Sequence, residues 1–107
     1  MTLTLDSKAR LNNGLEIPML GLGVYQSPPG RPTRQAVQYA LEIGYRHIDT
    51  AQAYGNESGV GEGIRACGVN REDMFVTTKL AAEVKSYKEA VASINTSLKT
   101  LGLIILI

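Results

Sequence analysis

Three residues of this sequence are suited to act together on a substrate: an aspartate, a tyrosine and a lysine. Asp49 lies near the end of one predicted strand, Tyr54 follows that strand, and Lys79 follows the next. Free tyrosine has a pKa of about 10 and is a poor proton donor at neutral pH, but a neighbouring ammonium favours its phenolate form. A carboxylate paired with the lysine would keep that ammonium charged and in place. The set therefore predicts a tyrosine tuned for general acid–base catalysis.

Plainer explanations exist for each member of this set. An Asp–Lys pair alone is more often a salt bridge, and a tyrosine alone is more often an amphipathic packing residue. We expect His47 to point into the wall of a barrel or to pack against a helix, without a catalytic role. Glycines at 21 and 23 are a weak signal, and Gln26 stands where the dinucleotide fingerprint of an open Rossmann sheet needs glycine.

Four strand-like runs predict the strands that position these residues. They are Met19–Tyr25, Tyr45–Thr50, Met74–Thr78 and Leu103–Ile107. Their regular recurrence, with helical patterns between them, predicts parallel strands joined by right-handed crossovers. The carboxyl ends of parallel strands meet at one edge, so Asp49, Tyr54 and Lys79 are expected to converge there. Either an open doubly wound sheet or a closed (β/α)8 barrel satisfies this pattern.

Helix signals fill the intervals between the strands. The first predicted helix starts at Thr33 and is ended by Gly44. The second has Asn56 as its N-cap and is ended by Gly68. The third starts with the capping box Ser86/Glu89 and is ended by Gly102. The third helix carries an apolar stripe: Tyr87, Ala90, Val91, Ile94, Leu98 and Leu101. In the second helix, Gly59, Gly61 and Gly63 would allow a close approach to a neighbour.

A β-hairpin is predicted ahead of these units. The short segments Lys8–Leu11 and Leu15–Pro18 flank Asn12-Asn13-Gly14, and Asn-Gly is a strong hairpin signal.

Composition excludes several classes of function. The chain has 107 residues, of which 44% are hydrophobic and 20% charged, and its net charge is +1, so nothing indicates a nucleic-acid partner or an acidic membrane surface. The longest apolar run, Leu103–Ile107, is far too short to span a bilayer. The single cysteine, Cys67, allows no intramolecular disulfide, and its place in a helical pattern predicts a small buried apolar residue. With one cysteine and one histidine, we expect no metal site. With no export signal in sight, we expect a cytoplasmic protein.

Four segments, in this order and spacing, resemble the aldo-keto reductases. They are Pro18–Tyr25, Gly44–Ala51, Tyr54–Glu57 and Phe75–Leu80, and the likeness extends from about Ala9 to Gly102. The resemblance implies an α/β fold of the (β/α)8 barrel type, here an incomplete barrel. Residues 8–18 would be a hairpin plug, and residues 19–107 about three strand–helix units and the start of strand four of a single domain.

The resemblance also implies an activity. Family members reduce an aldehyde or ketone to an alcohol with NADPH as the usual hydride donor. Tyr54 matches the family's proton donor, and Asp49 and Lys79 its supporting pair. Gly23, Val24, Tyr25 and Asp49 match positions near the nicotinamide end of the cofactor. A small carbonyl compound would be the substrate, while the oligomeric state is open.

The sequence also departs from the family. The family's fourth catalytic residue, a histidine at the end of strand four, has no counterpart, and a barrel of this kind needs about 250 residues. We therefore expect no measurable carbonyl reduction by these 107 residues alone. A truncated, non-catalytic remnant or interaction segment is the second hypothesis, and a small flavodoxin-like binding domain is the third.

Overall fold

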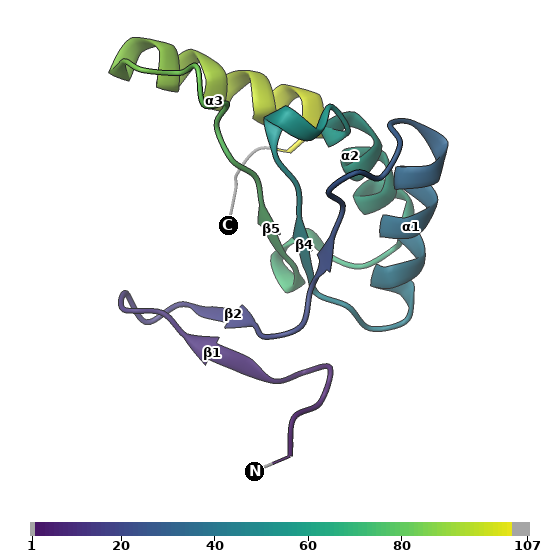
Figure 1. Ribbon diagram of the computed structural model, residues 1–107. Coiled ribbons are helices and arrows are strands. Elements are labelled where there is room, and N and C mark those ends of the chain that lie inside the picture. Colours follow the sequence, from purple (N-terminus) through teal and green to yellow (C-terminus); the bar gives the residue numbers. More distant parts are fainter. Residues whose placement is uncertain (1, 104–107) are drawn as a thin grey trace.

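The structure is a computed structural model that describes residues 2–103, and Figure 1 shows two small sheets beside a layer of helices. The first sheet is an antiparallel pair, β1 (Lys8–Arg10) and β2 (Glu16–Pro18). The second is parallel, with the order β3 (Leu22–Gly23), β4 (His47–Asp49) and β5 (Phe75–Thr77). Both the hairpin and the parallel order predicted from the sequence are thus confirmed in the described residues.

The parallel strands are shorter than predicted, especially the first. Val24 N donates to Asp49 O at 3.1 Å and Thr50 N donates to Thr77 O at 2.8 Å, so the pairing continues just past the strand ends. Before β3 the predicted strand pairing is absent, because Met19 N donates to Ser7 O at 2.9 Å and the Met19 side chain is exposed. The cause is local, because glycines on both sides of Leu22 weaken a strand and the preceding backbone bonds to the N-terminal loop instead.

The helices α1 (Arg31–Glu42), α2 (Glu57–Ala66) and α3 (Tyr87–Leu101) contribute to one apolar cluster on one face of the parallel sheet. Its buried members include Val37, Leu41, Ile48, Val60, Val76 and Leu101. The opposite face, which we call the inner face, presents the half-buried side chains of His47, Asp49, Phe75 and Thr77. A doubly wound sheet carries helices on both faces, whereas a barrel carries them only outside. The described residues therefore form a segment of barrel wall.

Two of the helix starts differ in detail from the sequence prediction. Helix α1 begins two residues before Thr33, because Pro32 in the first turn is already set for helical φ. Helix α2 does follow Asn56, but that side chain makes no capping hydrogen bond, since it is used elsewhere.

The three glycines of α2 bring it against both neighbouring helices, as predicted. A Cβ at Gly63 would lie 2.7 Å from Arg34 O of α1, and one at Gly59 3.0 Å from Gly30 O. A Cβ at Gly61 would collide with the backbone of Leu101 in α3. At Gly61 and Gly63 a side chain would force the helices apart, whereas at Gly59 the contact is only tight.

The apolar stripe of α3 is largely exposed, contrary to what its spacing suggests for a core helix. Tyr87 is 86% exposed and Val91 and Ile94 are each 41% exposed, whereas Leu101 is fully buried. Figure 1 shows the reason: the C-terminal end of α3 meets α2, while its N-terminal half extends beyond the sheet. Of the fourth predicted strand, residues 104–107 lie outside the described part of the chain.

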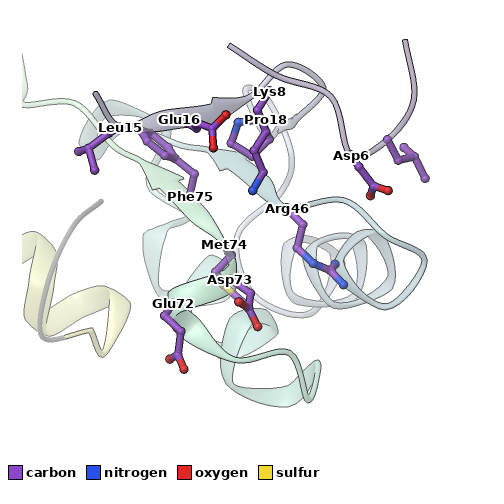
Figure 2. A pocket seen from close by; sticks show the side chains of 11 residues that line it. Asp6, Lys8, Leu15, Glu16, Pro18, Arg46, Glu72, Asp73, Met74 and Phe75 are labelled. Atoms are coloured by element: carbon purple, nitrogen blue, oxygen red, sulfur yellow. The ribbon is translucent and has the colours of Figure 1, made fainter. Parts of the chain in front are cut away.

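The hairpin lies at the amino ends of β4 and β5, opposite the edge where their carboxyl ends meet. A cavity of about 500 Å³ separates it from the sheet, and Glu16, Arg46, Asp73 and Phe75 are among its lining residues (Figure 2). This cavity is at the wrong end of the strands for the predicted chemistry. Within residues 2–103, no helix has the length and apolarity to cross a membrane, and no cluster of metal-binding side chains occurs.

Candidate active site

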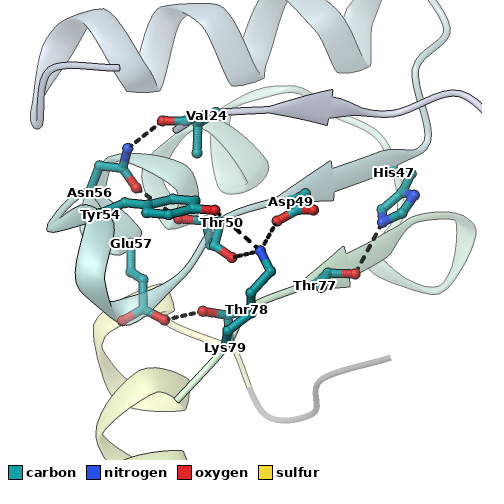
Figure 3. A network of polar contacts seen from close by, with 10 residues as sticks. All are labelled: Val24, His47, Asp49, Thr50, Tyr54, Asn56, Glu57, Thr77, Thr78 and Lys79. Atoms are coloured by element: carbon teal, nitrogen blue, oxygen red, sulfur yellow. Dashed lines mark hydrogen bonds and ion pairs between the residues drawn. The ribbon is translucent and has the colours of Figure 1, made fainter. Parts of the chain in front are cut away.

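Asp49, Tyr54 and Lys79 lie together at the carboxyl ends of the parallel strands (Figure 3). Asp49 ends β4, Tyr54 ends the short 3-10 helix η1 (Gln52–Tyr54), and Lys79 follows β5 by two residues. The pairing of Asp49 with Thr77 in the sheet brings the two loops side by side. We call this edge the rim.

Lys79 is the centre of the group. Its Nζ forms an ion pair with Asp49, donates to Thr50 O at 2.9 Å and lies 3.5 Å from the Tyr54 hydroxyl. The same nitrogen is 5.2 Å from the centroid of the Tyr54 ring. The side chains of Lys79 and Asp49 are 47% and 40% exposed, so the group is accessible from solvent.

Electrostatics keep this lysine charged. Partial burial alone would lower the pKa of Lys79, but the hydrogen bonds and negative charge supplied by Asp49, together with Tyr54, outweigh it, so the pKa of Lys79 lies above its ordinary value. The lysine is therefore an ammonium at neutral pH, close to the phenol oxygen. The sequence predicted this order of contacts, with the carboxylate holding the cation and the cation facing the phenol.

Asn56 holds the loops around the rim, a role that the sequence did not reveal. Its amide nitrogen donates to Val24 O at 3.0 Å and to Ser27 O at 3.2 Å, and its oxygen accepts from the Thr50 hydroxyl at 2.7 Å. The residue is only 1% exposed. Because this amide joins the loops after β3 and β4, it is unavailable to cap α2.

Glu57 ties the loop after β5 to α2. Its carboxylate accepts from the Thr78 hydroxyl at 2.6 Å, and the residue is 8% exposed. Sequence reasoning placed Glu57 only within a motif; an acidic residue at a helix start, next to a cap, was the available signal for a structural role.

The residues expected near a cofactor are placed differently from one another. Gly23 is exposed, and a Cβ there would meet nothing within 4 Å. Tyr25 is 69% exposed, with its ring centroid 5.2 Å from that of Tyr54. Val24 differs from the expectation, because it is 2% exposed and its side chain belongs to the apolar cluster beneath the sheet. Of these three, only Gly23 and Tyr25 offer surface to a ligand at the rim.

His47 lies two residues before Asp49 in β4, and both side chains are on the inner face. Its Nε2 is 3.0 Å from the Thr77 hydroxyl, its Nδ1 is 3.3 Å from Pro18 O, and its ring meets Phe75 edge-on. It thus lies on the inner face, where it connects the sheet to the hairpin, and not in the wall or against a helix as the sequence had suggested.

A parallel sheet with helices on one face and a polar group at its carboxyl rim defines the β/α-barrel class. The model of the aldo/keto reductase family matches residues 20–104. The chain belongs to the aldo/keto reductase family.

Individual relatives agree with this assignment. The chain is 50% identical, over 96% of its length, to the uncharacterized oxidoreductase YtbE of Bacillus subtilis, of which it covers 38%. An aldo/keto reductase from Brucella melitensis superposes with a TM-score of 0.90 and 43% identity over 99% of this chain and 40% of its own. The Bombyx mori aldo-keto reductase crystallised in complex with NADP gives 0.85 and 40% identity over 97% of this chain and 37% of its own. The chain thus spans about two fifths of the length of these relatives.

Proposed function

We propose that this chain supplies the proton-donating half of the active site of an NADPH-dependent reductase that converts an aldehyde or ketone to an alcohol. The observation that carries the proposal is the contact of the Lys79 ammonium with both Asp49 and the Tyr54 hydroxyl at an exposed rim. The family membership of the chain supports it.

Each residue of the group has a distinct task. Reduction of a carbonyl leaves an alkoxide oxygen that needs a proton, and Tyr54 Oη donates it. The Lys79 ammonium, 3.5 Å away, stabilises the phenolate that remains. Asp49 and Thr50 O hold that ammonium in place on its other side. Solvent reaches the rim and can return the proton to Tyr54.

The rim residues fit a flat ring next to this group. Gly23 leaves open surface where any side chain would project, and Tyr25 presents an exposed ring against Tyr54. We propose that Gly23, Tyr25 and Asp49 contact the nicotinamide end of NADPH, which supplies the hydride when bound. Val24 offers neither its buried side chain nor a free backbone group, because its N donates to Asp49 O and its O accepts from Asn56 Nδ2 and Ser27 N.

The proposal extends to the domain. Residues 8–18 would plug the base of one barrel, and residues 19–107 would form its first strand–helix units. A reducing compartment such as the cytoplasm suits a chain whose only cysteine, Cys67, is a buried free thiol. A small carbonyl compound is the substrate class.

A chimera tests this proposal. The segment of the Bombyx mori reductase that superposes on this chain is replaced by the chain itself, and NADPH oxidation is followed with an aldehyde. We expect turnover, and we expect Tyr54→Phe to lower kcat by about 10²–10⁴-fold while NADPH affinity is retained. The matched control is Tyr39→Phe, because Tyr39 is 65% exposed on α1, away from the rim.

Two results would count against the proposal. One is a folded chimera that binds NADPH but does not turn over. The other is a Tyr54→Phe chimera as active as the Tyr39→Phe control.

A further inference from the structure

Gln52 makes an unusually complete set of hydrogen bonds for one side chain. Its Nε2 donates to Ser97 Oγ at 2.8 Å and to Ser93 O at 3.0 Å. Its Oε1 accepts from Ala81 N at 2.9 Å and from Ser93 Oγ at 2.9 Å. Both donors and both lone pairs of the amide are therefore used, with the loop after β5 on one side and α3 on the other.

The main chain of Gln52 adds a fifth bond. Its backbone N donates to Lys79 O at 3.1 Å, which extends the pairing of β4 and β5 beyond their ends. Gln52 also begins η1, and Tyr54 ends it. One residue is thus bonded to the backbone of Lys79 while it begins the turn that carries Tyr54.

The turn itself is short, although the Tyr54 side chain packs against the apolar cluster. It is a single 3-10 turn of three residues with no side-chain cap, and none of its residues is buried. Hydrogen bonds of this helix type are poor in geometry, so an isolated turn is a weak platform. Gln52 bonds this turn to the loop after β5 through both its side chain and its backbone, beside the contacts made by Lys79 Nζ.

We propose that Gln52 is a positioning residue, whose amide locks η1 to the loop after β5 and to α3 and thereby sets the contact between Lys79 Nζ and Tyr54 Oη. Its catalytic consequence rests on the proposed function. The geometric claim does not, and it is tested without cofactor or substrate.

The amide is needed because it presents donors and acceptors together. A carboxylate at position 52 would keep the bonds from Ala81 N and Ser93 Oγ but would set its second oxygen against the carbonyl oxygen of Ser93. An apolar side chain would form none of the four hydrogen bonds that the Gln52 amide makes. A carboxylate therefore keeps only part of the set and adds a repulsive contact with Ser93 O, whereas an apolar side chain keeps none of it.

The experiment uses the whole 107-residue chain, isotope-labelled, and follows nuclear Overhauser contacts between the Lys79 side chain and the Tyr54 ring. The variants are Gln52→Leu and the double variant Ser93→Ala/Ser97→Ala. The double variant removes two partners of Gln52 and improves helix propensity in α3, so it guards against simple unfolding. The control is Gln38→Leu, because Gln38 bonds Glu42 on the exposed surface of α1.

We expect Gln52→Leu to lose the Lys79–Tyr54 contact. The double variant, which keeps the hydrogen bonds of Gln52 to Ala81 N and Ser93 O, should weaken that contact measurably. Contacts between Gly61 and Leu101 should persist in both variants, and Gln38→Leu should change neither set of contacts. The pKa of Lys79, measured from its Nζ resonance, should fall in Gln52→Leu and in the double variant, because the hydrogen bond with Tyr54 that helps to raise this pKa is weakened or lost. If the double variant and any folded Gln52→Leu chain keep the contact and the pKa of the unmutated chain, Gln52 does not position the rim. If Gln52→Leu does not fold, the double variant alone decides.

Discussion

Substituting alanine for Gly61 is expected to separate α2 from α3. The added methyl would overlap the carbonyl oxygen of Leu101, the nearest atom, and would lie 2.6 Å from the carbonyl carbon and 2.9 Å from the Cα of that residue. Carbon atoms in ordinary contact are about 3.5–4.0 Å apart, so α3 must withdraw by about 1 Å. These are backbone atoms, which cannot rotate aside as a side chain can.

The size of the effect follows from two opposing terms. Overpacking of this kind costs about 1–3 kcal/mol, and the immobile backbone favours the upper end. Alanine is about 1 kcal/mol better than glycine within a helix. The net loss is therefore about 2 kcal/mol of the free energy of unfolding, which for a small domain lowers Tm by about 8 °C or more.

The assay is urea unfolding followed by circular dichroism, with the slope of the transition checked for constancy. Gly59→Ala is the matched control, because its methyl would come no closer than 3.0 Å to Gly30 O and 3.2 Å to the Thr33 side chain. There the gain in helix propensity should roughly cancel the crowding. Equal midpoints for the two variants would refute the packing account of these glycines.

Two further predictions concern the supports of the rim. Asn56→Leu leaves Val24 O and the Thr50 hydroxyl without the amide that bonds them in a buried site, so urea unfolding should show a loss of about 2–4 kcal/mol. The second concerns pH: because the pKa of Lys79 is raised above its ordinary value, the ion pair with Asp49 stabilises the fold fully from neutral pH up to that ordinary value. Its contribution is lost as pH rises through the higher folded pKa, so Tm values of the chain and of Asp49→Asn should differ near neutrality and converge at strongly alkaline pH. The ion pair should contribute less than about 1 kcal/mol to the free energy of unfolding, because both side chains are nearly half exposed. A difference in Tm that stays constant from neutral to strongly alkaline pH would contradict the assignment.

The sequence predicted the parallel units and the convergence at the rim because both follow from periodicity and chain order. Asp49 ends one predicted strand and Lys79 follows the next, and parallel pairing leaves such residues only one edge at which to meet. The alternate glycines of α2 likewise predicted close packing, which the contacts of Gly61 and Gly63 confirm.

Other features depend on contacts between distant segments and could not be predicted in this way. Asn56 has the residue type of an N-cap, yet its amide bonds Val24 O, which lies 32 residues earlier. Gln52 carries no pattern at all, since its partners Ser93 and Ser97 become neighbours only through the packing of α3. Val24 is buried because its side chain lies on the same face of the strand as Leu22, and the sequence did not show which residues of the first strand face the helices.

The central claim is that the Lys79 ammonium makes Tyr54 an effective proton donor. The most direct measurement is kcat and NADPH affinity of the chimera carrying Lys79→Met, beside Lys85→Met, which removes an exposed lysine from the following loop. The account predicts that Lys79→Met lowers kcat by about 10²-fold or more with NADPH affinity preserved, and that Lys85→Met changes neither. A Lys79→Met chimera that turns over as fast as the Lys85→Met control would contradict it.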